Sequence, residues 1–261
     1  MAASSRPVTR LWTEEDLSAG ATLGLDHARA HFLRSVLRLE RGAALALFNG
    51  RDGEWRARIE GLGKGWCSLV VEDRLREQTT GPDLWLAFAP IKRARLDFLV
   101  EKATELGCAL LQPVMTRHTA VGRVNLDRLK TNAREAAEQC ERLDLPEVRE
   151  VTDLGKLLDA WPAERRLLVC AESGDAEPLA EALLALREGA PSTENPWAIL
   201  TGPEGGFARS ELDALNDLPF AIKVGLGPRV LRADTAAVAA LACWQAILGD
   251  GAARPPHRQG D

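Results

Sequence analysis

The C-terminal half of the chain contains the segment Trp197-Ala-Ile-Leu-Thr201-Gly-Pro-Glu-Gly-Gly-Phe207, in which an apolar run changes abruptly to a glycine-rich stretch. A short apolar run bounded by turn residues is typical of a buried strand. A sequence with helical periodicity follows from Ser210. This succession predicts a strand over Trp197–Thr201, a tight loop, and a helix over Ser210–Asn216.

The same succession recurs on both sides of this segment. Downstream, a predicted strand over Phe220–Val224 precedes the loop Gly225-Leu-Gly-Pro-Arg-Val-Leu-Arg-Ala-Asp234 and a helix over Thr235–Leu248. Upstream, we predict strands over Leu84–Ile91, Ala109–Met115 and Arg166–Glu172, and helices over Ala94–Leu106, Asn125–Glu141 and Pro178–Arg187. Such alternation favours an α/β domain with a largely parallel sheet covered on both faces. From alternation alone we expect an unknotted, doubly wound sheet, because knots are nearly absent from proteins.

The first 76 residues have a different pattern, which predicts a small and mostly β unit. Asp26 is the expected N-cap of a helix that carries apolar residues at helical spacing, and Asn49-Gly-Arg-Asp-Gly53 predicts a hairpin. The predicted strands are Ala21–Leu25, Ala43–Phe48, Glu54–Ile59 and Trp66–Val71, and the apolar helix residues are Phe32, Leu33, Val36 and Leu37. The polar stretch Glu72–Asp83 indicates an interdomain connection. We therefore expect domains at 1–76 and 84–249, a linker at 77–83 and a disordered tail at 250–261.

Composition excludes several protein classes. With 46% hydrophobic and 27% charged residues among 261, the chain is neither disordered nor fibrous. The charge-free stretch Thr235–Gly249 is too short for a bilayer, and no secretory signal is evident at the start. We therefore expect a soluble, cytoplasmic protein. The five cysteines form no C-x-x-C pair and the four histidines have no third ligand nearby, so we expect neither a disulfide framework nor a metal.

Charge is unevenly distributed along the chain. The net charge of −5 argues against a nucleic-acid partner, because phosphate binding favours Lys and Arg. By region, however, residues 1–76 carry +2, residues 77–150 carry −1 and residues 151–261 carry −6. Seven arginines lie between His27 and Arg58. They form either a solvated face, since Arg is the usual cation of this chain, or a patch that binds a phosphate backbone.

The two glycine-rich loops are the candidate ligand site. In open α/β sheets ligands bind beyond the carboxyl ends of strands, where these loops lie. Neither loop matches G-x-x-x-x-G-K-[ST] or G-x-G-x-x-G, and Glu204 would repel a pyrophosphate. A nucleoside-like ligand that has a positive centre and no phosphate fits better, and S-adenosylmethionine is such a molecule.

The last predicted helix, Thr235–Leu248, is apolar on nearly every side. Such a helix must be buried all round. One face covers the sheet, and the remainder belongs either to the core of a monomer or to the seam of a homodimer. We favour the homodimer.

The two glycine-rich loops contain the stretches Leu-Thr-Gly-Pro-Glu-Gly-Gly-Phe207 and Leu-Gly-Pro-Arg-Val-Leu-Arg-Ala-Asp-Thr-Ala236. Together these stretches resemble the signature of the ribosomal RNA small-subunit methyltransferase E family. Three further segments are similar to it, and the resemblance extends from about Arg10 to Gly249. They are His31-Phe-Leu-Arg-Ser-Val-Leu-Arg38, Lys102-Ala-Thr-Glu-Leu-Gly107 and Glu135-Ala-Ala-Glu-Gln-Cys-Glu-Arg142. The family methylates uracil N3 in 16S rRNA and belongs to the SPOUT class.

The resemblance implies a fold, a cofactor and partners. It implies an α/β SPOUT methyltransferase domain with a C-terminal trefoil knot, and a small N-terminal PUA-like β-barrel that binds RNA. It also implies S-adenosylmethionine as cofactor, 16S rRNA of the small ribosomal subunit as substrate, and a homodimer formed through the C-terminal domain. Membrane and metal are not expected.

The resemblance also suggests roles for particular residues. Uracil N3 carries a proton at neutral pH, so the site needs a base or a cation that stabilises the developing anion. We assign the cation to Arg232 and leave the base open between Asp234 and Glu204, while Arg229 holds the loop or contacts RNA. Relatives commonly have Glu in place of Asp234, so a carboxylate function and a helix cap before Thr235 both remain.

The remaining expected site residues fall into two groups. The cofactor contacts are Ala171, Glu172, Leu200, Thr201, Gly202, Pro203, Glu204, Gly205, Gly206, Val224, Gly225, Leu226, Gly227, Leu231, Arg232, Ala233 and Thr235. The RNA contacts are Arg10, His31, Arg34, Arg38, Arg51, Arg93, Lys102, Arg117 and Arg142.

Two other functions remain open at this point. One is a SPOUT-class enzyme that methylates another rRNA site or a tRNA. The other is a non-catalytic RNA-binding protein of ribosome assembly, although both glycine loops and Arg232 are intact.

Overall fold

The computed structural model describes residues 6–171, 176–189 and 196–254, which form two compact units. Unit 1 comprises the chain up to Thr80 together with Ala137–Leu145, and unit 2 comprises Gly81–Ala136 and the chain from Pro146 onward. The segment Ala137–Leu145 thus groups with the N-terminal residues, although the sequence pattern placed it within the second domain. Of the expected tail at 250–261, residues 255–261 lie outside the described residues.

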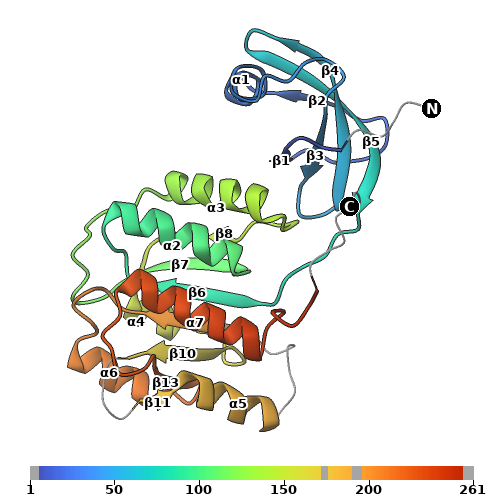
Figure 1. Cartoon of the computed structure of the whole chain (residues 1–261). Coiled ribbons are helices and arrows are strands. Elements are labelled where there is room, and N and C mark those ends of the chain that lie inside the picture. The colour runs from blue at the N-terminus through green and yellow to red at the C-terminus, as the bar shows by residue number, and fades with distance from the viewer. Residues whose placement is uncertain (1–5, 172–175, 190–195, 255–261) are drawn as a thin grey trace. The chain divides into compact units, whose positions relative to one another are not determined.

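Unit 1 contains a five-stranded sheet in the order β1-β3-β4-β5-β2 (Figure 1). Strand β1 runs parallel to β3, and the other neighbours are antiparallel. Leu33, Leu45, Ile59 and Leu69 are among the buried residues of its core. The elements are β1 (Arg10–Trp12), β2 (Thr22–Leu25), α1 (His27–His31), η1 (Phe32–Val36), β3 (Ala44–Phe48), β4 (Glu54–Gly63) and β5 (Trp66–Arg76).

The expected N-cap of α1 is confirmed, because the Asp26 side chain accepts a hydrogen bond from the Arg29 N–H at 2.8 Å. The helix then widens into the π-helical turn η1. Leu33 is buried there, whereas Phe32 and Val36 are 38% and 60% exposed. The i→i+5 turn disrupts the 3.6-residue period on which the expected apolar face rested. Strand β5 also runs to Arg76, so the first part of the predicted connection Glu72–Asp83 is strand.

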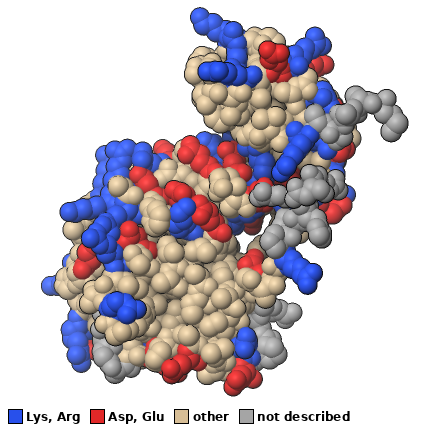
Figure 2. Space-filling view, in the orientation of Figure 1, with Lys and Arg blue, Asp and Glu red and all other residues tan. Residues whose placement is uncertain are grey.

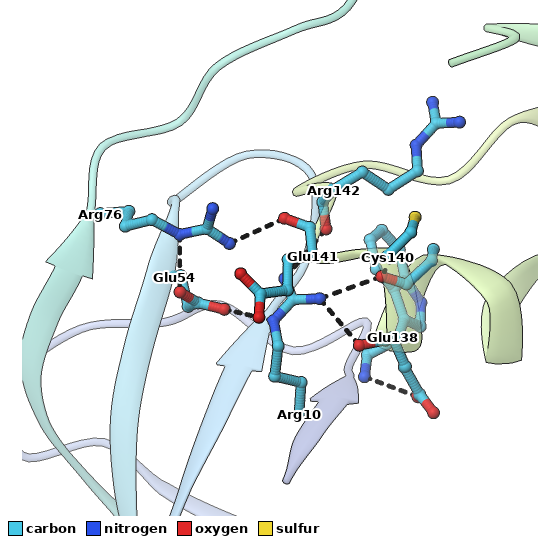
Figure 3. A network of polar contacts seen from close by, with 9 residues as sticks. Arg10, Glu54, Arg76, Glu138, Cys140, Glu141 and Arg142 are labelled. Atoms are coloured by element: carbon cyan, nitrogen blue, oxygen red, sulfur yellow. Dashed lines mark hydrogen bonds and ion pairs between the residues drawn. The ribbon is translucent and has the colours of Figure 1, made fainter. Parts of the chain in front are cut away.

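A network of polar contacts fixes Ala137–Leu145 within unit 1 (Figure 3). The Glu54 carboxylate lies between the guanidinium groups of Arg10 and Arg76 and pairs with both. Arg10 also donates to the carbonyl oxygens of Ala137, Glu138 and Arg142 at 2.9–3.0 Å, and Arg76 donates to that of Glu141 at 2.8 Å. These carbonyls lie at and beyond the end of helix α3 (Leu126–Cys140), where intrahelical donors are lacking. The arginines supply the missing donors.

Unit 2 is built on a sheet whose strands are all parallel, in the order β11-β13-β10-β12-β6-β7-β8, with β9 also paired to β7. The α/β class expected from the alternation is confirmed. The strands are β6 (Leu84–Phe88), β7 (Leu110–Met115), β8 (Glu147–Val148), β9 (Thr152–Asp153), β10 (Arg166–Cys170), β11 (Glu177–Pro178), β12 (Trp197–Thr201) and β13 (Ala221–Gly225). The helices are α2 (Arg93–Glu105), α3 (Leu126–Cys140), α4 (Leu154–Asp159), α5 (Leu179–Gly189), α6 (Arg209–Asn216) and α7 (Ala233–Ile247).

Alternate residues of the central strand β12 enter different cores. Ile199 of β12 joins a core with residues of α2, α3, α5 and α7, whereas Ala198 and Leu200 join one with residues of α4 and α6. Helices therefore cover both faces of the sheet, as expected.

Helix α7 packs against α2 and α5 (Figure 1). Ala237, Ala240, Leu241 and Trp244 are fully buried, whereas Ala242 is exposed. Figure 2 shows a broad area over α7 that has no charged side chain. One face of this apolar helix is therefore left without a cover within the described chain.

Candidate functional site

A cavity of about 700 Å³ lies at the carboxyl ends of β10, β12 and β13. These three strands are neighbours in the parallel sheet, so the segments that follow them meet at one edge. The lining comes mainly from the two glycine-rich loops and from the start of α7. It consists of Cys170, Ala171, Ala176, Pro178, Thr201, Gly202, Pro203, Glu204, Gly205, Gly206, Phe207, Leu212, Gly225, Leu226, Gly227, Pro228, Arg229, Val230, Leu231, Ala233 and Ala236.

The first loop turns sharply after β12. The Gly206 N–H donates to the Pro203 carbonyl at 2.9 Å, and Gly206 has a φ of +67°. A Cβ on Gly202 would lie 3.1 Å from the Phe207 ring. A left-handed φ and close packing both favour glycine, which explains the sequence of this loop.

The second loop connects β13 to α7. The Val224 carbonyl at the end of the strand accepts from the Ala171 N–H at 3.1 Å, which joins it to the segment after β10. Gly227 has a φ of +96°, and nothing lies within 4 Å of the position of an added Cβ. Glycine is therefore required there by backbone conformation rather than by space.

The structure gathers most of the expected cofactor residues around this cavity. Leu200 and Val224 are buried in the strands that precede the loops, whereas Arg232 and Thr235 are exposed at the start of α7, and these four are not part of the lining. Glu172 lies outside the described residues. The lining residues present in the expectation are Ala171, Thr201, Gly202, Pro203, Glu204, Gly205, Gly206, Gly225, Leu226, Gly227, Leu231 and Ala233.

Several lining residues were not anticipated from the sequence. Phe207, Pro228, Arg229 and Val230 belong to the same two loops, and treating each loop as one continuous wall would have found them as cofactor contacts. The remaining lining residues that the sequence analysis did not name are Cys170, Ala176, Pro178, Leu212 and Ala236. Ala176 and Pro178 reach the cavity only because β11 pairs with β13, which no local sequence signal reveals.

The charged residues of the site differ in their surroundings. Glu204 and Arg229 are exposed residues of the cavity wall. The Asp234 carboxylate is 13% exposed and accepts from the Arg95 guanidinium of α2 at 3.2 and 3.4 Å. The interpretation of Asp234 as a helix cap is wrong, because Arg232 occupies the N-cap position and Asp234 lies in the first turn. A carboxylate in that turn still interacts favourably with the helix dipole.

Cys170 is the one sulfur-bearing residue of the cavity wall among the described residues. Burial raises the pKa of its thiol to about 12, because the thiolate loses its solvation there. The thiol is therefore neutral at physiological pH and acts as a small apolar part of the wall.

The expected RNA contacts divide into exposed and engaged side chains. In unit 1, His31, Arg34 and Arg38 are exposed, while Arg51 pairs with Asp16 and Arg142 with Asp144. The side chain of Arg10 is only 12% exposed and holds Glu54 and three carbonyls. The structure therefore gives Arg10 a structural role instead of the expected RNA contact.

In unit 2, Arg93 begins α2 and Arg117 follows β7, and both residues are exposed. Lys102 lies between Glu101 and Glu105 at 2.8 Å from each carboxylate. These contacts reduce the positive charge that Lys102 presents to an anionic partner.

Neither a metal centre nor a membrane span is found in the part of the chain that the structure describes. No group of three or more His, Cys, Asp or Glu side chains there is arranged to hold a metal ion. No helix among residues 6–171, 176–189 and 196–254 is long and apolar enough to cross a bilayer.

Comparison with known proteins agrees with this architecture. Residues 79–245 match the RNA methyltransferase domain family, and residues 25–72 match the RNA methyltransferase PUA domain family. The ribosomal RNA small subunit methyltransferase E of Rickettsia conorii is 34% identical over 220 residues, which are 84% of this chain and 87% of that protein. The enzyme of the same name from Synechocystis is 32% identical over 87% of this chain and 74% of its own length.

Two solved structures are similar over nearly the whole chain. A methyltransferase from Legionella pneumophila, solved with S-adenosylmethionine, has a TM-score of 0.82 and 28% identity over 94% of this chain and 100% of its own. The ribosomal RNA small subunit methyltransferase E of Neisseria gonorrhoeae, also bound to S-adenosylmethionine, has a TM-score of 0.82 and 26% identity over 93% and 99%. The chain belongs to the ribosomal RNA small subunit methyltransferase E family.

Proposed function

We propose that this protein transfers a methyl group from S-adenosylmethionine to N3 of a uridine in 16S rRNA of the small ribosomal subunit, and so acts in the cytoplasm. The observation that carries the proposal is the cavity itself. It is formed by the two loops that resemble the family signature, at the edge of a parallel sheet. Family membership supplies the reaction class.

The residues of the cavity fit S-adenosylmethionine. A volume of about 700 Å³ lies within the usual range for a cofactor or drug-sized molecule. Gly205, Gly206 and Gly227 leave backbone groups accessible to a nucleoside. Apolar residues such as Leu226 and Leu231 suit its rings, and the Glu204 carboxylate favours a positively charged ligand.

When bound, S-adenosylmethionine supplies a methyl group on a positively charged sulfur, which an aligned nucleophile accepts without further activation. The protein must therefore position the base and manage the N3 proton. We assign the Arg232 guanidinium, which is exposed at the N-cap of α7, the role of stabilising negative charge on a uracil carbonyl oxygen. Of the two carboxylates that the sequence offered as the base, Asp234 is engaged by Arg95, and Glu204 is an exposed residue of the cavity wall.

We extend the proposal to the assembly. A homodimer formed through α7 would bury the uncharged area in Figure 2. Phe98 of α2 and Leu184 of α5, which are 44% and 40% exposed, lie on the two helices that pack against α7 and would enlarge this surface. We also propose the SPOUT trefoil knot for unit 2 and a PUA-like barrel for unit 1, as the family resemblance implies.

RNA recognition is proposed for both units. His31, Arg34 and Arg38 of unit 1 and Arg93 and Arg117 of unit 2 are exposed and suited to phosphate contacts. Such contacts make RNA affinity fall as the salt concentration rises.

The decisive experiment is methylation of small ribosomal subunits from a strain that lacks the enzyme, followed by mass spectrometry of the nucleosides. N3-methyluridine in 16S rRNA is the expected product. A different methylated nucleoside, or activity on tRNA alone, would contradict the proposal. Binding of RNA without binding of S-adenosylmethionine would instead indicate an assembly factor.

A further inference from the structure

The turn that follows β7 is held by hydrogen bonds beside the first glycine loop. Within Thr116–Thr119, the Thr119 N–H donates to the Thr116 carbonyl at 3.1 Å, and the Thr116 N–H donates to the Thr119 hydroxyl at 3.0 Å. Glu211 of α6 adds a bridge, because its carboxylate accepts from the backbone N–H groups of both Arg117 and Ala208 at 2.8 Å. The turn is thereby tied to the helix that follows the loop, so its side chains are preorganised.

His118 projects from this turn onto the loop. Its Nδ1 lies 3.1 Å from the Gly205 carbonyl oxygen and 3.3 Å from that of Gly206. A Cβ on Gly205 would lie 3.3 Å from the His118 Cβ, so the residue packs directly against the loop backbone. Gly205 and Gly206 line the cavity, whereas His118 does not, and it is exposed. It therefore borders the cofactor cavity on a surface that a second substrate can reach.

The two carbonyl contacts determine which ring nitrogen carries the proton. A carbonyl oxygen only accepts hydrogen bonds, so Nδ1 must donate. In the neutral ring the lone pair then lies on Nε2, which becomes the basic atom. The loop orients the ring as a carboxylate or carbonyl orients the histidine of many catalytic sites.

We propose that His118 is the base that removes the N3 proton of the target uracil, an inference that rests on the methyl transfer proposed above. The N3–H bond breaks and the proton passes to Nε2 of His118. The electron pair left on N3 forms the new bond to the methyl carbon, whose bond to sulfur breaks with both electrons retained by sulfur. His118 later returns its proton to solvent.

The surroundings of His118 allow this role. The charged groups on the turn, on the loop and at the start of α6 are Arg117, Glu204, Arg209 and Glu211. Glu211 is occupied by two backbone donors, and Arg209 pairs with Asp213. A neutral imidazole accepts a proton on one ring nitrogen and later releases it, as a general base must.

Substitution of His118 by Asn distinguishes the role of Nδ1 from the role of Nε2. In His118→Asn the side-chain amide nitrogen occupies the position of Nδ1 and still donates to the loop, but nothing replaces Nε2. We expect unchanged S-adenosylmethionine affinity by calorimetry and unchanged RNA affinity, with turnover at neutral pH reduced at least ~100-fold. His27→Asn, an exposed histidine of unit 1, is the matched control and should retain wild-type turnover.

An NMR measurement tests the assignment without any turnover. Long-range ¹⁵N–¹H correlation of the imidazole rings, with the His118 signals identified by their loss in His118→Asn, should show the neutral ring protonated on Nδ1. Protonation on Nε2 would overturn the proposal, as would His118→Asn turnover within threefold of wild type or an equal loss of cofactor affinity. If the wild type forms no N3-methyluridine, the proposed function itself fails, and this outcome is distinct from a normal rate in the variant.

Discussion

Replacement of Glu54 by Gln tests the contact network that joins Ala137–Leu145 to the sheet of unit 1. The Glu54 side chain is 8% exposed and pairs with Arg10 and Arg76. Removing one partner of a buried ion pair costs about 3–5 kcal/mol, because the other charge is left uncompensated. Arg10 keeps its three carbonyl acceptors, and Arg76 is 26% exposed, so we expect the lower end of that range, about 3 kcal/mol.

Amide hydrogen exchange on the full chain measures this cost within unit 1. A loss of about 3 kcal/mol should accelerate exchange in β3 and β4 on the order of 100-fold, while the β10 and β12 amides of unit 2 change little. Asp16→Asn is the matched control. The side chain of Asp16 is 94% exposed, so its ion pair with Arg51 should contribute less than about 1 kcal/mol to the stability of unit 1. Exchange of β3 and β4 within threefold of wild type in Glu54→Gln would refute the reasoning.

The same carboxylate predicts a pH dependence. Burial raises the pKa of Glu54, but the hydrogen bonds and charges of Arg76 and Arg10 outweigh it and leave the pKa below its ordinary value of 4.5. A lowered folded-state pKa gives stability that is fully present above the unfolded value and is lost as pH falls through the folded value. Protection of β3 and β4 should therefore decline below about pH 4.5 in the wild type. This contribution should be absent from Glu54→Gln.

Three further predictions concern the cavity. Arg232→Ala should fold normally and lose methyl transfer at least ~100-fold, measured with labelled cofactor, because the developing uracil anion loses its cation; near-normal turnover would contradict the assignment. Gly227→Ala should weaken S-adenosylmethionine binding several-fold in calorimetry, since a φ of +96° costs a residue with a Cβ at least about 1 kcal/mol. Gly122→Ala, where an added Cβ meets nothing within 4 Å, should leave the affinity unchanged. Cys170 should resist iodoacetamide at pH 8 in the native chain and react after denaturation, because its pKa is raised to about 12; rapid native alkylation would contradict a neutral thiol.

Elements that rest on local pattern were predicted well. The runs Trp197–Thr201 and Ala44–Phe48 are apolar because both of their faces are buried, so their strand character is visible in the sequence. The N-cap at Asp26 depends only on a hydrogen bond to Arg29 and was equally visible. Short elements such as β1 and β11 were missed, because a strand of two or three residues is defined by its partner and has no periodicity of its own.

The sequence predicted the two loops of the candidate site but not the partners of its charged side chains. Closely spaced glycines mark the two loops, but the partner of a charged side chain depends on long-range packing. Arg95 is 139 residues from Asp234, and its guanidinium occupies a carboxylate that the sequence offered as a base. Arg10 was expected on an RNA-binding surface, yet it is engaged by carbonyls more than 120 residues away.

The sequence by itself therefore determined the α/β class, the mostly β first unit and the two loops that line the cavity, because these depend on hydrophobic period and on glycine conformation. Only the tertiary structure decided which charges are engaged, that Ala137–Leu145 belongs with unit 1, and that His118 lies against Gly205. The physical reason is the range of the interactions. Periodicity and backbone conformation are properties of neighbouring residues, whereas a hydrogen bond between a turn after β7 and a loop after β12 exists only once the parallel sheet has brought the ends of its strands to one edge.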